Sequence, residues 1–107
     1  SNIKDITKAL SYVSAGEKLG KGKDDPALMI ARGDIYLKTE QGGGDAMTSY
    51  ERATLADPNN VQAYVRKGQL NMRARTYNEA KTNFDKAISL DPNYAPAYNA
   101  LAETYYF

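Results

Sequence analysis

The residue types that could carry out chemistry in this chain are limited, because it contains neither Cys nor His. Their absence excludes disulfides, thiol nucleophiles, Cys/His zinc sites and acid–base catalysis by imidazole. Carboxylates, Lys, Tyr, Ser and Thr remain, and no arrangement of them in the sequence predicts a catalytic centre. We therefore expect no enzymatic activity, no cofactor and no metal site within these residues.

Two short motifs resemble functional sites but have structural explanations. Gly42-Gly43-Gly44 is followed by Asp45, whereas a phosphate-binding loop needs a Lys and a Ser or Thr after its glycines. We interpret the glycine run as an extended turn between helices. Asp24-Asp25 stands directly before Pro26, where carboxylates cap a helix and complement its dipole. Helix capping explains this pair better than a metal or acid–base site does.

The near-neutral net charge of the chain limits the classes of partner that it could attract by electrostatics alone. Lys and Arg number 14 and Asp and Glu 13, a net charge of +1, which gives no general attraction to nucleic acid or anionic lipid. The apolar runs are too short for membrane insertion. The chain begins Ser1-Asn2 without an initiator Met, so we interpret it as a piece of a longer protein. A Cys-free, Tyr- and Asn-rich composition favours a bacterial cell envelope, without fixing the compartment.

An internal repeat organises most of the chain. Asp57-Pro58-Asn59 recurs as Asp91-Pro92-Asn93, a shift of 34 residues. The same shift relates further apolar and small positions, namely Ala46 to Ala80, Tyr50 to Phe84, Ala53 to Ala87 and Ala63-Tyr64 to Ala97-Tyr98. Upstream of the glycines the shift becomes 35, which indicates one inserted residue at that turn. A period of this length is typical of stacked helical repeats.

Each repeat is predicted to form a hairpin of two amphipathic helices. Apolar or small residues recur at helical spacing over 63–74 and 80–90, and Asp91-Pro92 ends the second run because Pro cannot continue a helix. Gly68 and Ala80 are expected to let the two helices approach closely beside Phe84. In the first segment, Ile3, Ile6, Leu10 and Val13 share one face of a helix, before a Gly20–Lys23 connector.

These residues resemble the tetratricopeptide repeat family. Its pattern, W-x2-L-G-x2-Y followed by A-x3-F and P, is matched here by Met29-x2-Arg32-Gly33-x2-Tyr36, Ala46-x3-Tyr50 and Pro58, and by Tyr64-x2-Lys67-Gly68, Ala80-x3-Phe84 and Pro92. A third unit begins at Tyr98-x2-Leu101. Arg32 and Lys67 replace the usual Leu, and we expect their stems to cover apolar surface while their charges reach water.

The resemblance implies an all-α fold, a right-handed α–α superhelix (a tetratricopeptide repeat solenoid) of antiparallel hairpins with about five helices. We expect four segments: an N-terminal helix and linker over 1–25, repeats over 26–60 and 61–94, and the first helix of a further, truncated repeat over 95–107. Tyr36, Tyr50, Tyr64 and Tyr98 fall at packing positions of these repeats. We therefore expect them in the core, not as stacking platforms for bases.

The resemblance also implies where a partner binds. In this family the first helix of each repeat lines a concave groove, so a protein or peptide is the expected ligand. The lining residues expected here are Ile30, Asp34, Leu37, Lys38, Gln62, Val65, Arg66, Gln69, Met72, Arg73, Asn99, Glu103 and Tyr106. Arg66 and Arg73 can bind a carboxylate or a backbone carbonyl. The alternatives are an architectural spacer within a longer repeat protein, or the regulatory arm of an enzyme, with no binding site of its own.

Members of the family that clamp the acidic C-terminal tails of heat-shock chaperones use Lys, Asn and Arg side chains on these first helices. The matching positions here are Ile30, Asp34, Arg66, Pro96 and Ala100. Only Arg66 is basic, and Asp34 would repel the carboxylates of such a tail. The sequence therefore predicts that the chain is not a co-chaperone of this type.

The C-terminal segment is unusually aromatic. Its apolar residues are Tyr98, Leu101, Tyr105, Tyr106 and Phe107, and no second helix of the repeat follows to cover them. Because helical solenoids need polar terminal caps, we expect the chain either to self-associate through this end or to fray there.

Overall fold

The computed structural model describes residues 3–19, 25–39 and 42–106. Within these residues the chain forms six helices and no strands: α1 (Ile3–Leu19), α2 (Pro26–Tyr36), α3 (Gly43–Ala56), α4 (Val61–Arg73), α5 (Tyr77–Leu90) and α6 (Ala95–Tyr106). The count is close to the five or so expected, and the helices of the four predicted segments themselves add up to six. The predicted connector at 20–23, Asp24 and Phe107 lie outside the described residues.

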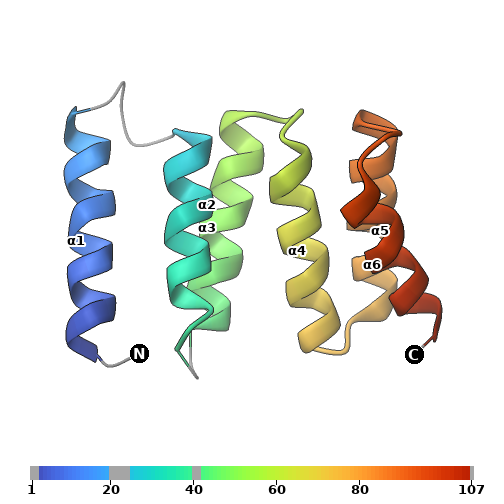
Figure 1. Ribbon diagram of the computed structural model, residues 1–107, viewed down its shortest axis with the longest axis horizontal. Coiled ribbons are helices and arrows are strands. Elements are labelled where there is room, and N and C mark those ends of the chain that lie inside the picture. The colour runs from blue at the N-terminus through green and yellow to red at the C-terminus, as the bar shows by residue number, and fades with distance from the viewer. Residues whose placement is uncertain (1–2, 20–24, 40–41, 107) are drawn as a thin grey trace. The chain divides into compact units, whose positions relative to one another are not determined.

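The chain divides into two compact units, Ser1–Pro58 and Asn59–Phe107. In the first unit α2 packs against both α1 and α3, and in the second α4, α5 and α6 all contact one another. Successive helices within each unit run in opposite directions, so that α4 and α6 run the same way (Figure 1). The division into repeats over 26–60 and 61–94 stays a prediction.

Short polar side chains begin α2 and α4. The Asp25 carboxylate accepts a hydrogen bond of 2.9 Å from the Ala27 amide, and Pro26 is the first helical residue. The Asn60 side chain likewise accepts a hydrogen bond of 3.1 Å from the Ala63 amide. Each side chain satisfies a backbone donor that has no partner within the helix. The helix start predicted at Asp25-Pro26 is therefore confirmed.

The glycine run differs from the extended turn that was expected. Gly43 and Gly44 belong to α3, and only Gly42 precedes it as the N-cap. A Cβ atom at Gly42 would lie 1.9 Å from the Tyr36 carbonyl oxygen, so the chain can pass Tyr36 closely only with glycine here. Asp45 falls in the first turn of α3, where its charge complements the helix dipole.

Close contacts between a glycine and an aromatic ring join the helices of both hairpins. A Cβ atom added to Gly68 on α4 would lie 2.3 Å from Cε1 of Phe84 on α5, and one added to Gly33 on α2 would lie 2.4 Å from Cε1 of Tyr50 on α3. Both aromatic side chains are fully buried. The buried hydrophobic cluster of the second unit comprises Val65, Ala80, Phe84, Ala87, Ala97 and Ala100. Close approach of the helices at these small residues was the sequence prediction, and the structure confirms it.

The four tyrosines expected in the core differ in burial. Tyr50 is fully buried, and its hydroxyl donates a hydrogen bond of 2.6 Å to Asp34. Tyr36 and Tyr64 are half-buried. Tyr98 is 46% exposed, so its prediction as core was wrong. Tyr64 on α4 packs against the cluster to which α5 contributes, whereas within the described residues no helix follows α6 to cover Tyr98.

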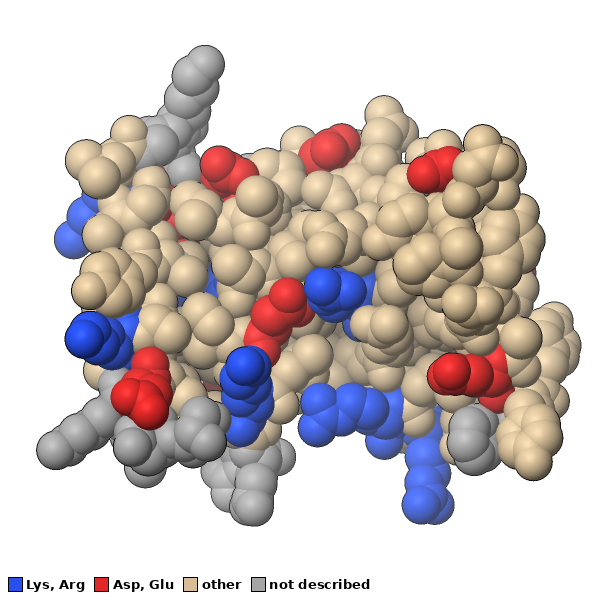
Figure 2. Space-filling view, in the orientation of Figure 1, with Lys and Arg blue, Asp and Glu red and all other residues tan. Residues whose placement is uncertain are grey.

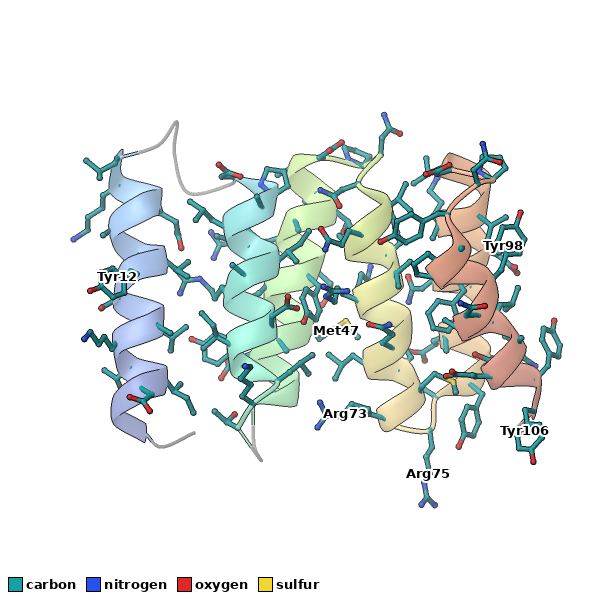
Figure 3. All side chains as sticks on the ribbon, in the orientation of Figure 1. Tyr12, Met47, Arg73, Arg75, Tyr98 and Tyr106 are labelled. Carbon is teal, nitrogen blue, oxygen red and sulfur yellow. The ribbon has the colours of Figure 1, made fainter. Side chains whose placement is uncertain are left out.

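The aromatic face of α6 is open to solvent. Tyr105 is 69% exposed and Tyr106 86%, and both Tyr98 and Tyr106 project from α6 on the side away from α4 (Figure 3). The Lys81 ammonium of α5 lies 4.3 Å from the ring centroid of Tyr105, a cation–π contact that joins these two helices. Self-association through this face stays a prediction.

The two basic residues at the usual Leu positions have different environments. Lys67 is half-buried and its ammonium lies 5.5 Å from the ring centroid of Tyr64. Arg32 on α2 forms an ion pair with Glu17 on α1, and the side chains of Arg32 and Glu17 are only 20% and 11% exposed. The hydrogen bond to Glu17 raises the pKa of the Arg32 guanidinium, and burial opposes this rise. The Arg32 charge therefore meets a carboxylate. The sequence had predicted that this charge would reach bulk water, and for Arg32 that prediction was wrong.

Changing Glu17 to Gln should weaken the attachment of α1. The substitution leaves a largely buried guanidinium without its counter-charge, and Arg32 Nε already has no hydrogen-bond partner. We expect the free energy of unfolding to fall by about 1–2 kcal/mol, measured by urea denaturation followed by circular dichroism. Glu51→Gln, at an exposed position of α3, is the matched control. An equal loss in both variants would contradict a stabilising ion pair.

Candidate functional site

Helices α4, α5 and α6 surround a pocket in the second unit. Its volume is about 440 Å³. The lining residues are Gln69, Met72 and Arg73 of α4, Phe84 of α5, and Pro96, Asn99, Ala100 and Glu103 of α6. The pocket combines apolar side chains with four polar ones, an arrangement typical of sites that bind organic ligands or peptides.

The apolar part of the pocket is held in place by the core of the unit. Phe84 is fully buried and Ala100 is 8% exposed. The hydroxyl of Thr104, itself 2% exposed, donates a hydrogen bond of 2.9 Å to the Ala100 carbonyl oxygen and lies 3.2 Å from Sδ of Met72. Met72 therefore rests on α6, although it belongs to α4. This contact limits the freedom of an otherwise flexible side chain.

The C-terminal end of α4, which carries Met72 and Arg73, is fixed by its backbone. The Thr76 amide donates a hydrogen bond of 2.9 Å to the Asn71 carbonyl oxygen, and the Arg75 amide donates one of 3.1 Å to the Met72 carbonyl oxygen. Arg75 has a φ of 64°. This pattern is the Schellman motif that ends many helices. The Asn71 side chain is buried, and its amide oxygen accepts a hydrogen bond of 2.7 Å from the side-chain amide of Asn83 on α5. Backbone and side-chain bonds thus hold this end of α4 against α5.

The polar rim of the pocket is available to a ligand. Gln69, Arg73, Asn99 and Glu103 are all exposed, and their side chains form no hydrogen bond or ion pair with the rest of the described chain. Arg73 extends from the end of α4 (Figure 3). In the same view, basic side chains gather at that end of α4 and an acidic one lies over the lower part of α6 (Figure 2). The rim therefore carries one charge of each sign and two amides.

The structure brings together five of the thirteen residues that the sequence predicted for the groove. These five are Gln69, Met72, Arg73, Asn99 and Glu103. Val65 is 1% exposed within the hydrophobic cluster of its unit and Ile30 is 5% exposed, so both side chains serve packing. The other six lie outside this pocket: Asp34 on α2, Leu37 and Lys38 just after it, Gln62 and Arg66 on α4, and Tyr106 at the end of α6.

Three lining residues were not predicted for the groove. Phe84 was assigned to the core alone, and its fully buried ring also borders the pocket from within the core. Pro96 and Ala100 lie with Asn99 and Glu103 at successive spacings of 3, 1 and 3 residues. Such spacing places them on one face of α6, a signal that the sequence offered.

Within the described part of the chain, two kinds of feature are absent. No group of three or more Asp or Glu residues could hold a metal ion. None of the described helices combines the length and apolar character needed to cross a membrane.

Comparison with known proteins places this architecture in a family. Two family models, both described as tetratricopeptide repeat, match residues 61–94 and 83–106, a range that contains every residue of the pocket. Residues 61–106 belong to the tetratricopeptide repeat family. A search of curated protein sequences gave no match. The fold class predicted from the sequence, an all-α tetratricopeptide repeat solenoid of helix hairpins, is confirmed.

Solved tetratricopeptide repeat domains have the same fold. The Arabidopsis OM64 domain is 26% identical with a TM-score of 0.78, over 94% of this chain and 81% of that domain. The first repeat domain of Spaghetti (RPAP3), bound to the HSP90 peptide SRMEEVD, is 20% identical with a TM-score of 0.81, over 96% of this chain and 79% of that one. The second domain of human RPAP3, in complex with the HSP70 peptide SGPTIEEVD, is 24% identical with a TM-score of 0.79, over 94% and 81%.

Proposed function

We propose that this tetratricopeptide repeat protein is an interaction scaffold that binds a segment of another protein in the pocket between α4 and α6. The observation that carries the proposal is the pocket itself, whose apolar lining is Met72, Pro96 and Ala100 in addition to the buried ring of Phe84, beside four polar side chains that form no hydrogen bond or ion pair within the described chain. An apolar side chain of the ligand would be buried there, and the rim amides could bond its backbone.

Similar domains support this use of the fold. The RPAP3 domains are described in complex with short peptides of HSP90 and HSP70. Fold alone does not fix function, so the argument rests mainly on the composition of the pocket. We propose that the remaining predicted groove residues, including Gln62, Arg66 and Tyr106, extend the binding surface beyond the pocket.

A pair of matched double variants tests the proposal. Peptides selected from a phage-displayed random library on the parent chain are titrated by fluorescence anisotropy against Arg73→Ala/Asn99→Ala and against Arg75→Ala/Asn78→Ala. Both variants lose one Arg and one Asn at exposed positions, but only the first alters the pocket. We expect the pocket variant to bind at least about tenfold more weakly, a loss of about 1.4 kcal/mol, and the control to bind like the parent.

The alternative functions predict other results. Equal binding by both variants would place any ligand outside the pocket. A failure of the library to yield any binding peptide would favour the architectural spacer or the regulatory arm of an enzyme. Circular dichroism melting curves must first show that both variants keep the helicity and stability of the parent, because a loss of fold would also abolish binding.

A further inference from the structure

The pocket rim carries two charges of opposite sign and no others. Arg73 stands on α4 and Glu103 on α6, the two parallel helices that flank the pocket. Neither side chain forms an ion pair with any described residue. Both charges therefore stay available to a ligand, and a ligand that crosses the pocket from one helix to the other meets both.

From this arrangement we infer that the preferred ligand is a peptide segment with one apolar side chain between an acidic and a basic residue. The inference rests on the proposed function, because it describes the ligand of the same pocket. The acidic residue pairs with Arg73, the basic residue pairs with Glu103, and the apolar side chain enters between Met72 and Ala100. Charge complementarity at the rim sets which partners are accepted more than how tightly they bind.

The pocket has room for the central apolar side chain on a rigid floor. A volume of about 440 Å³ lies toward the small end of the range found for ligand pockets. Phe84 and Ala100 are buried in the hydrophobic cluster and Met72 is held by Thr104, so the floor cannot open without disturbing the core. A pocket of this volume has room for any single apolar side chain of the ligand.

The same charges select against a purely acidic tail. The HSP70 peptide bound by human RPAP3, SGPTIEEVD, has three acidic residues and no basic one. In this pocket a single Arg would attract it while Glu103 would repel it, and a like charge without compensation is an effective means of excluding a ligand. The discrimination between this peptide and a segment of mixed charge therefore depends on Glu103.

Reversal of that one charge tests the inference. Library-selected peptides and SGPTIEEVD are titrated by fluorescence anisotropy against the parent chain, Glu103→Arg and Glu103→Gln. We expect the peptides selected on the parent to share an apolar residue flanked by one acidic and one basic residue. Glu103→Arg should bind these about five- to tenfold more weakly and should bind SGPTIEEVD about five- to tenfold more tightly. Glu103→Gln, the milder change, should move both affinities in the same directions by less.

The outcomes separate this inference from the proposed function. Peptides that lose affinity for Arg73→Ala/Asn99→Ala, but lack a basic residue or bind Glu103→Arg unchanged, would overturn the inference and leave the pocket as a binding site. Selected peptides that do not distinguish the pocket variant from its Arg75→Ala/Asn78→Ala control would overturn both. A final check is the double reversal Arg73→Glu/Glu103→Arg, for which selection should return the acidic and basic residues in the opposite order.

Discussion

Truncation of Phe84 to Ala should lower the free energy of unfolding by about 3–5 kcal/mol. Phe84 is fully buried in a cluster whose other buried members are Val65 and four Ala residues, and partly buried side chains such as Tyr64 and Leu101 pack against this cluster. Loss of the ring removes its buried apolar contacts and leaves a cavity that the surrounding side chains refill only in part. A loss of this size is a large part of the stability of an ordinary domain.

Thermal and urea unfolding followed by circular dichroism measure this effect. Leu55→Ala is the control, because Leu55 is a large apolar residue on α3 that is 81% exposed, and its truncation should change stability by less than about 0.5 kcal/mol. Similar losses in the two variants would mean that the ring does not hold the second unit together. Phe84→Leu, which retains most of the apolar volume, should fall between Phe84→Ala and the parent.

Addition of a single methyl group at Gly68 should also destabilise the chain, although alanine is the better helix former. The new Cβ atom would lie 2.3, 2.6 and 2.7 Å from three carbons of the Phe84 ring, so the buried ring would have to shift within the hydrophobic cluster. Overpacking of this kind costs about 1–3 kcal/mol. It opposes a gain of about 1 kcal/mol in helix propensity, and we expect a net loss.

Gly44→Ala is the matched control for Gly68→Ala. Both glycines lie in helices, but a Cβ atom at Gly44 meets nothing within 4 Å, so this variant should be as stable as the parent or more stable by up to about 1 kcal/mol. In the double variant Gly68→Ala/Phe84→Leu the two losses of stability should be less than additive, because the smaller side chain leaves room for the methyl group. If Gly68→Ala raised the melting temperature as Gly44→Ala does, the close contact would have no energetic role.

Local patterns in the sequence were sufficient for much of the fold. The recurrence of small and aromatic residues at Gly33 and Tyr50, and at Gly68 and Phe84, predicted two close hairpins, and the structure places each pair in contact. The helix start at Asp25-Pro26 was equally readable, since capping depends on residues only a few positions apart. Pattern alone failed at Gly43 and Gly44, which are helical although they are poor helix formers, because packing of α3 against α2 outweighs their propensity.

The sequence by itself thus determined the all-α class, the hairpins and the absence of Cys and His chemistry, because composition and short-range periodicity carry that information. Only the tertiary structure decided which surface residues converge. Met72 and Thr104 are 32 residues apart and lie in contact, and Arg32 meets Glu17 on a neighbouring helix. Periodicity gives the face of a helix on which a residue lies, but not the partner helix that buries it. It therefore could not separate the buried Val65 from Gln69, whose side chain is free to bind.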